Sequence, residues 1–290
     1  MMIDGVFLGG ENCVVVALGI DAGGVKQVLD FEAGSSESLE TVRRLICRLE
    51  KRGVRSPAES PLFVVRDGSE AIKSAVAQMW LGALQQTCLV HLKRNISDRL
   101  RQRDRGESQL LFRRLRKAEG KAPGEEAYED SREFVAERNA TAGLILVERR
   151  EEALTLHRLG VPSTLNVTFL STCVIEPERS EDSLANDSLP RQNIVRNWRE
   201  QTGNVKRCSV RGDMIQCWAA SGLQWAKVGF RRIWLHEDLA SLTAALQERG
   251  HSLAASIGAS ASSMRSSASA PIEAASEELT YNHQSTTLTT

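Results

Sequence analysis

Short apolar runs rich in β-branched residues dominate the first third of the chain and predict a sheet. Three of these runs are separated by Gly/Asn/Asp clusters at 9–12 and 21–24, a pattern typical of antiparallel strands joined by tight turns. We expect these strands at 3–8, 13–20 and 25–32. A helix should follow, opened by Ser35 and Ser36 and closed by Gly53, because apolar residues recur between them at helical spacing.

A fourth strand is predicted where four apolar residues follow one another at 62–65. It leads into Asp67, after which Gly68 and Ser69 turn the chain into a helix with one apolar face. A short strand around 87–90 comes next. The resulting order, β-β-β-α-β-α-β, indicates an α/β fold with a mixed sheet and helices on its faces.

The pattern becomes helical after this sheet, over an all-helical block at 91–160. The segment at 162–172 is poor in helix formers and is expected to be extended. Further helices are predicted at about 212–232, where Trp218 and Trp225 are expected in the core, and at 239–249. Residues 251–290 are Ser/Ala-rich with almost no large apolar residues, which predicts a disordered tail.

Charge is balanced overall but unevenly distributed. Lys+Arg and Asp+Glu both number 37, so the total gives no sign of an acidic partner. Residues 91–121 carry eleven Lys/Arg against four Asp/Glu, and residues 193–233 carry eight against two. Such local basic faces can bind nucleic acid, although solvated helix faces are the alternative.

The cysteines and the hydropathy pattern indicate the compartment. The six cysteines are scattered without a C-x-x-C pair, and no targeting segment precedes the first strand. This pattern fits reduced thiols better than a disulfide framework. No apolar run approaches the ~18 residues of a membrane span. We therefore expect a cytoplasmic protein that has no membrane partner.

Two carboxylates are expected to meet at one edge of the sheet. Asp4 lies near the start of the first strand and Asp67 follows the fourth, and these strands are natural parallel neighbours in this order of elements. Converging carboxylates repel unless a divalent cation lies between them. A cluster of this kind can hold two ions ~4 Å apart. The alternative for Asp67 is a helix N-cap, a role that can coexist with metal binding.

Four segments of the chain together resemble the signatures of a known family. They stand in order at 3–6 (Ile-Asp-Gly-Val), 64–71 (Val-Val-Arg-Asp-Gly-Ser-Glu-Ala), 88–95 (Cys-Leu-Val-His-Leu-Lys-Arg-Asn) and 170–176 (Leu-Ser-Thr-Cys-Val-Ile-Glu). They resemble the mutator-type bacterial insertion-sequence transposases. The segments at 198–207 and 229–233 are similar to that family's C-terminal part, so the resemblance covers about residues 2–248.

The resemblance implies a ribonuclease H-like core with a D-D-E triad, interrupted by a helical insertion before the glutamate. Carried across, Asp4, Asp67 and Glu176 are the catalytic and metal-binding carboxylates. The implied cofactor is Mg²⁺ (or Mn²⁺), and the implied reaction is phosphoryl transfer at DNA ends: water cuts a strand, then a 3′-hydroxyl attacks target DNA. Implied partners are double-stranded DNA, as insertion-sequence ends and target, and a second copy of the chain in a homodimer, in a nucleoid-associated protein.

The predicted helical block falls where this family carries its insertion. We therefore divide the chain into the first part of the ribonuclease H-like core (1–90), the helical insertion (91–160), the completion of the core with Glu176 and the C-terminal helices (161–250), and the disordered tail (251–290).

Cys88 and His91 match a Cys-x-x-His signature of the family and are expected to support the site. A lone pair lacks two of the four ligands of a structural zinc. Hydrogen bonding of His91 near the DNA or the carboxylates, or packing at the helix start, remain open. Basic residues that flank the motifs are expected to contact DNA phosphates, with a solvated face as the alternative. They are Lys93, Arg94, Arg196, Arg199, Lys206 and Arg207.

The chain also departs from the family's pattern. It starts directly at the first strand, without the family's N-terminal helical region that binds the terminal repeats. A polar stretch at 177–190 with Pro at each end predicts a loop, which moves the family-like Arg196 and Arg199 some fifteen residues further from Glu176. The alternative function is a non-catalytic DNA-binding or dimerising remnant of such a transposase. A different ribonuclease H-like nuclease is a weaker alternative.

Overall fold

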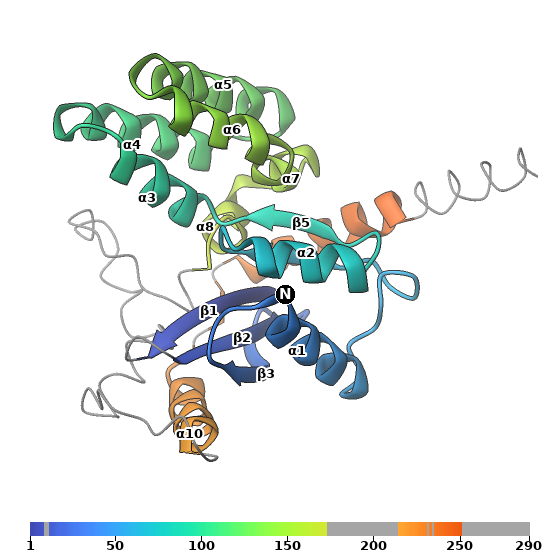
Figure 1. Ribbon diagram of the computed structural model, residues 1–290. Helices are drawn as coiled ribbons and strands as arrows, with labels where there is room; N and C mark the ends of the chain where they lie inside the picture. Colours follow the sequence, from blue (N-terminus) through green and yellow to red (C-terminus); the bar gives the residue numbers. More distant parts are fainter. Residues whose placement is uncertain (9–11, 173–213, 231, 234, 251–290) are drawn as a thin grey trace, which may run out of the picture. The chain divides into compact units, whose positions relative to one another are not determined.

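The computed structural model describes residues 1–8, 12–172, 214–230, 232–233 and 235–250 (Figure 1). Within these residues, five strands form one sheet in the order β3-β2-β1-β4-β5. The first three strands are antiparallel neighbours, whereas β4 and β5 continue the sheet in parallel with β1. The strands are β1 (Met2–Leu8), β2 (Asn12–Ile20), β3 (Lys26–Gly34), β4 (Phe63–Arg66) and β5 (Leu84–Thr87).

Helices cover both faces of this sheet. On one face, α1 (Leu39–Lys51) and α2 (Glu70–Met79) pack against one core cluster, in which Trp80 is fully buried. On the other face, a second cluster is continuous with α3 and the helices after it. Side chains alternate along a strand, so Ile3 joins the first cluster and Met2 the second. The predicted mixed α/β sheet and its element order are confirmed.

Antiparallel helices follow β5. The central three, α4, α5 and α6, pack against one another in sequence, and α6 also contacts β5 (Figure 1). An apolar run at 144–147 lies inside α6, where Ala142, Leu146 and Ala153 are buried at helical spacing. The domain limits stay predictions. The helices are α3 (Leu89–Arg99), α4 (Gln102–Lys117), α5 (Lys121–Arg138), α6 (Ala140–Ala153) and α7 (Thr155–Arg158).

Two predicted boundaries differ from the structure because of caps. Helix α1 begins after Ser38, whose side chain accepts a hydrogen bond from the Thr41 amide, so the helix starts later than Ser35–Ser36. Strand β5 ends at Thr87, because the Cys88 thiol caps α3 and turns Leu89 and Val90 into its first residues. The predicted strand around 87–90 was therefore placed about three residues too late.

The prediction of an extended segment at 162–172 was wrong. After Pro162 the chain forms η1 (Ser163–Leu165) and α8 (Asn166–Phe169), which are short helical turns. Leu165 and Phe169 are both buried, and the Phe169 ring packs edge-on against Phe63 with ring centroids 6.1 Å apart. Packing against the sheet thus outweighs the low helix propensity of this segment.

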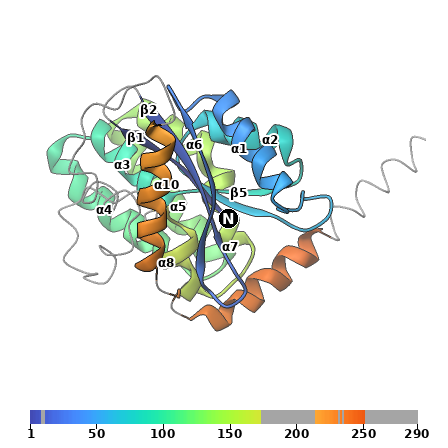
Figure 2. The same cartoon turned by 90° about the horizontal axis from the view of Figure 1, so that it is seen from below.

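The described C-terminal part contains α10 (Met214–Val228), η4 (His236–Asp238) and a helix at 239–250. Helix α10 packs against β3 (Figure 2). Of the two tryptophans expected in the core, Trp218 is partly buried, whereas Trp225 is 55% exposed. No helix among the described residues is long and apolar enough to cross a membrane. The predicted loop at 177–190 and the predicted disordered tail lie outside the described residues.

Candidate functional site

Asp4 lies on β1, and Asp67 directly follows the adjacent parallel strand β4. Met2 pairs with Val65 and Ile3 with Arg66, so the next step of the same register places Asp4 beside Asp67. Asp4 alternates with Ile3 and therefore shares the sheet face of Met2, while Asp67 continues the side of Val65. The topology therefore brings the two carboxylates together, on the sheet face that the helices after β5 cover.

The Asp4 carboxylate is fully buried and poorly solvated. Burial raises the pKa of Asp4 well above its ordinary value, the negative charge of Asp67 raises it further, and the nearby His91 imidazole lowers it. Thr172 also lies close enough to lower this pKa, but its hydroxyl bonds His91, and no donor of the described residues makes a well-formed hydrogen bond to either Asp4 oxygen. Two buried acceptor atoms without donors fit a bound cation.

Asp67 lies in a turn and does not cap the helix that follows. Its Oδ1 accepts a hydrogen bond from the Ser69 amide at 3.0 Å, whereas the N-cap of α2 is Ser69, whose hydroxyl accepts from the Ile72 amide. The Asp67 side chain is half-buried, in contrast to Asp4. The N-cap alternative is therefore wrong.

Hydrogen bonds join the start of α3 to residues 170–172, the last residues that the structure describes before residue 173. The Leu89 amide donates to the Leu170 carbonyl at 2.8 Å, and the Thr172 amide donates to Cys88 Sγ at 3.3 Å. Thr172 Oγ1 and His91 Nδ1 form a hydrogen bond of 3.2 Å. We call these three bonds the Cys88–Thr172 latch. It places a buried Thr172 next to Asp4, four residues before Glu176.

The latch also lowers the pKa of the Cys88 thiol. Burial alone would raise the pKa of Cys88, but the His91 imidazole and hydrogen bonds from His91 and Thr172 lower it to about 7. Within the described part of the chain, no three His, Cys, Asp or Glu side chains form a metal-binding group. His91 forms its hydrogen bond with Thr172 close to the Asp4 carboxylate, which is one of the roles that the sequence left open.

Gly5, which follows Asp4, allows a close contact on the opposite face of β1. A Cβ at this position would lie 2.7 Å from the Glu37 carboxyl carbon. Glu37 sits near Cys13 on that face and raises the pKa of the Cys13 thiol, together with burial, to about 12. The glycine that follows Asp4 thus leaves room for the Glu37 side chain, whereas the Asp4 side chain lies on the other face of the sheet.

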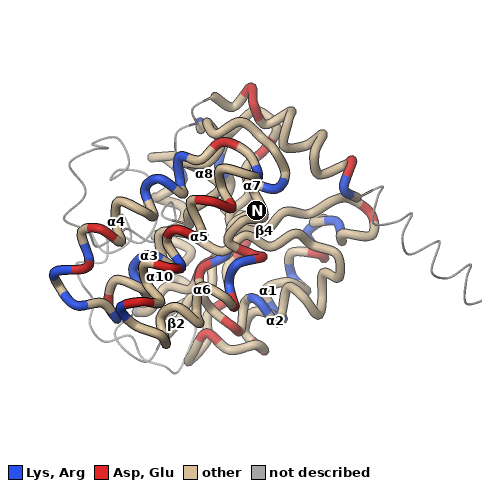
Figure 3. The backbone as a smooth tube through the Cα atoms, turned by 90° about the horizontal axis from the view of Figure 1, so that it is seen from above, with Lys and Arg blue, Asp and Glu red and all other residues tan. Residues whose placement is uncertain are grey.

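The basic residues predicted to contact DNA divide into two groups. Lys93 and Arg94 lie on α3, two and three residues beyond His91, and both are half-buried. Basic positions continue along α4 (Figure 3), with acidic residues among them in its first half and none in its second half. Five residues of the predicted site lie outside the described residues: Glu176, Arg196, Arg199, Lys206 and Arg207.

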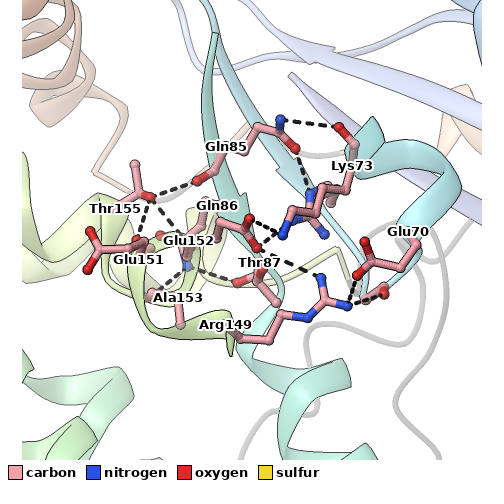
Figure 4. A network of polar contacts seen from close by, with 12 residues as sticks. Glu70, Lys73, Gln85, Gln86, Thr87, Arg149, Glu151, Glu152, Ala153 and Thr155 are labelled. Carbon is pink, nitrogen blue, oxygen red and sulfur yellow. Dashed lines mark hydrogen bonds and ion pairs between the residues drawn. The ribbon is translucent and has the colours of Figure 1, made fainter. Parts of the chain in front are cut away.

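A polar network that the sequence reasoning missed joins α6 to α2 (Figure 4) and includes the backbone of Asp67. Arg66, fully buried at the end of β4, donates to the Asp67 carbonyl and to Glu152 of α6. Arg149, also on α6, donates to the Gly68 carbonyl. The only sequence signal was a buried-type strand that ends on an arginine, which gives no partner by itself.

Comparison with known proteins supplies the family. Residues 8–181 match the model of the family described as "Transposase, Mutator family". This range contains Asp67, Cys88, His91 and Glu176, and it begins four residues after Asp4.

Three bacterial proteins are similar to parts of the chain. The transposase for insertion sequence element IS905 of Lactococcus lactis is 26% identical over 189 residues, which is 62% of this chain and 46% of the relative. The transposase for IS1201 of Lactobacillus helveticus is 31% identical over 112 residues (39% and 29%). The transposase for ISRM5 of Rhizobium meliloti is 31% identical over 90 residues (31% and 22%). The chain therefore spans less than half the length of each of these relatives.

Proposed function

The chain belongs to the Mutator family of transposases, and we propose that it is the catalytic domain of an insertion-sequence transposase that cleaves and transfers DNA strands. Asp4, Asp67 and Glu176 are its metal-binding and catalytic carboxylates. One observation carries the proposal: Asp4 is buried beside Asp67, the residue that follows the neighbouring parallel strand. Neither Asp4 oxygen receives a well-formed hydrogen bond from a donor of the described residues.

The proposed cofactor is Mg²⁺ or Mn²⁺, hard cations that prefer carboxylate oxygens. Bound there, they would activate the attacking oxygen and stabilise the leaving oxygen. The protein itself places two carboxyl groups side by side, and burial, followed by the negative charge of Asp67, raises the pKa of Asp4. Asp67 presents one oxygen to the Ser69 amide, which fixes its orientation.

The Cys88–Thr172 latch supports the third carboxylate in this proposal. Glu176 follows Thr172 by four residues, and the latch ties Thr172 to the start of α3 next to Asp4. An anchored Thr172 limits how far the chain that carries Glu176 can move from the two aspartates, because four residues span at most about 14 Å.

We also propose a ribonuclease H-like core. The sheet topology supports it. Strands β1, β2 and β3 are antiparallel, β1 pairs in parallel with β4, and β4 pairs in parallel with β5. The second carboxylate follows the fourth strand, and the helices α3 to α7 lie between it and Glu176.

The proposed partner is double-stranded DNA at element ends and target, and the proposed assembly is a homodimer. Lys93 and Arg94 follow the latch on α3 and would contact phosphates close to the carboxylates. Nothing in the described residues favours a non-catalytic remnant over this function.

The test is a strand-cleavage assay of the 290-residue chain on duplex DNA that carries insertion-sequence ends, with Mg²⁺ or with EDTA. We expect Mg²⁺-dependent nicking, which Asp67→Asn lowers at least about 100-fold because a lost ligand also misplaces the cation. Asp30→Asn, on β3 and away from the carboxylates, is the control for general destabilisation. Equal cleavage by wild type and Asp67→Asn would contradict the catalytic proposal.

A further inference from the structure

We propose that Glu152 and Arg149 of α6 are positioning residues for Asp67, so that a helix of the block after β5 fixes the aim of a catalytic carboxylate. The inference rests on the proposed function for the role of Asp67. Its structural content, that α6 orders the turn after β4, stands on the contacts that follow.

Arg66 is the link between the turn and α6. Its guanidinium is fully buried and donates three hydrogen bonds: to Gln85 Oε1 (2.7 Å), to the Asp67 carbonyl (2.9 Å) and to Glu152 Oε2 (2.7 Å). A buried guanidinium without an anionic partner is strongly destabilising, so Arg66 holds this position only while Glu152 neutralises it. The carbonyl of Asp67 is therefore fixed through Glu152.

The Glu152 carboxylate also lies close to two further basic side chains near the turn. Its Oε1 pairs with Lys73 Nζ of α2 at 2.6 Å, and its Oε2 lies 3.8 Å from Arg149 Nη1. Lys73 belongs to the helix into which the Asp67 turn leads. One carboxylate thus ties the strand before Asp67 to the helix after it (Figure 4).

Arg149 holds the turn at its next residue. Its guanidinium donates to the Gly68 carbonyl at 3.2 Å and forms an ion pair with Glu70, the first residue of α2. Gly68 is exposed, and a Cβ there would meet nothing within 4 Å. Packing around Gly68 therefore adds little order to this turn. The carbonyls of Asp67 and Gly68 are held instead by Arg66, which pairs with Glu152 of α6, and by Arg149 of α6.

Helix α6 and the short helix α7 that follows it are also held on the sheet by other contacts. Gln86 of β5 donates to the Ala153 carbonyl (2.9 Å) and accepts from the Leu156 amide (2.9 Å). Thr155 Oγ1 donates to the Gln85 carbonyl at 2.7 Å. These bonds do not involve Glu152, so we expect a Glu152→Gln variant to keep α6 in place while it loosens the turn.

The first measurement is amide hydrogen exchange on the metal-free, full-length chain. The Ser69 amide donates to Asp67 Oδ1, so its exchange reports the orientation of the Asp67 side chain directly. We expect Glu152→Gln to speed exchange in the 67–70 segment roughly tenfold and to leave the amides of β5 unchanged. The control, Asp30→Asn, removes a carboxylate that is more buried than Glu152 and has two arginine partners, Arg48 and Arg52, on the other face. It should not change exchange at 67–70.

The second measurement is Mn²⁺ affinity from calorimetric titration of the same variants. We expect Glu152→Gln to weaken Mn²⁺ binding about 10- to 100-fold, as partners of ligands commonly do, and Asp30→Asn to leave it unchanged. If Glu152→Gln unfolds the chain, Arg149→Gln serves in its place, because it removes the bond to Gly68 and leaves the Arg66–Glu152 pair.

The outcomes separate the two proposals. Unchanged exchange at 67–70 in Glu152→Gln and Arg149→Gln would overturn the positioning role, even if Asp67→Asn abolishes Mn²⁺ binding. Loss of ordering at 67–70 in these variants, with Mn²⁺ binding equal in wild type and Asp67→Asn, would support the positioning of Asp67 and contradict the proposed function instead.

Discussion

Asp67 stands one position beyond the pairing of Ile3 with Arg66, which makes it the parallel-strand neighbour of Asp4. The two residues differ in their surroundings. Asp4 is fully buried without a well-formed hydrogen bond from any described donor, whereas Asp67 is half-buried and accepts a bond from Ser69. The pair therefore combines one poorly solvated carboxylate with one oriented carboxylate.

Asp4→Asn should stabilise the metal-free chain while it removes cleavage activity. The pKa of Asp4 is raised above its ordinary value of 3.8, so its contribution to stability is full below that pH and is lost as pH rises through the raised pKa. At pH 8, well above 3.8, the wild type bears the free-energy cost of this raised pKa and the variant does not. We expect Asn to add roughly 1 kcal/mol, a few degrees in Tm, measured by thermal unfolding in EDTA. A lower Tm for the variant at pH 8 would contradict a raised pKa of Asp4.

Cys88→Ala should destabilise the chain more than Cys88→Ser. Alanine leaves the buried Thr172 amide without its acceptor, which costs about 1–3 kcal/mol, whereas serine retains an acceptor. Chemical denaturation of the two variants measures the difference. Cys47→Ala, at an exposed cysteine, is the control and should unfold like the wild type. Equal losses for Ala and Ser would show that the Cys88 thiol acts through packing alone.

The stability of the chain should fall as pH drops below neutrality because of His157. This imidazole is buried, and its Nε2 bonds the Leu115 carbonyl at 3.0 Å. Burial lowers its pKa below the ordinary 6.5, so the neutral ring contributes stability above pH 6.5 that is lost as pH falls through the lowered pKa. Thermal unfolding at pH 7.5 and 5.5 should show a smaller loss for His157→Gln than for wild type. An unchanged loss would assign the pH dependence to other groups.

Replacing Lys93 and Arg94 together by alanine should weaken duplex DNA binding and flatten its salt dependence. Each phosphate contact contributes about 0.9 to the slope of log affinity against log salt, so two lost contacts lower the slope by about 2. Fluorescence anisotropy between 50 and 200 mM salt measures it. Arg44→Ala, on α1 and paired with Glu32, is the control. Identical slopes for all three proteins would favour the solvated-face alternative for Lys93 and Arg94.

Much of the fold could be predicted because local patterns determine it. The three hairpin strands, the strand before Asp67 and the helical run after β5 each carry their own periodicity or turn residues, and each is found within a few residues of its predicted place. Gly53 lies just past α1 with a positive φ of 96°, as its position in the pattern required. Two boundaries were displaced by local caps, whereas the failure at 162–172 came where a tertiary contact outweighed propensity: η1 and α8 form because Leu165 and Phe169 are buried.

The candidate site divides in the same way. Which carboxylates could meet followed from the sequence alone, since the order of strands makes β1 and β4 neighbours, with Asp4 near the start of β1 and Asp67 directly after β4. The residues that surround them are brought together only when the chain packs into its tertiary fold. Thr172 lies 81 residues from His91 and Glu152 lies 86 residues from Arg66, separations at which no periodicity links two positions. A hydrogen bond needs its partners within about 3 Å, so such pairs exist only once the sheet and the helices around it have packed.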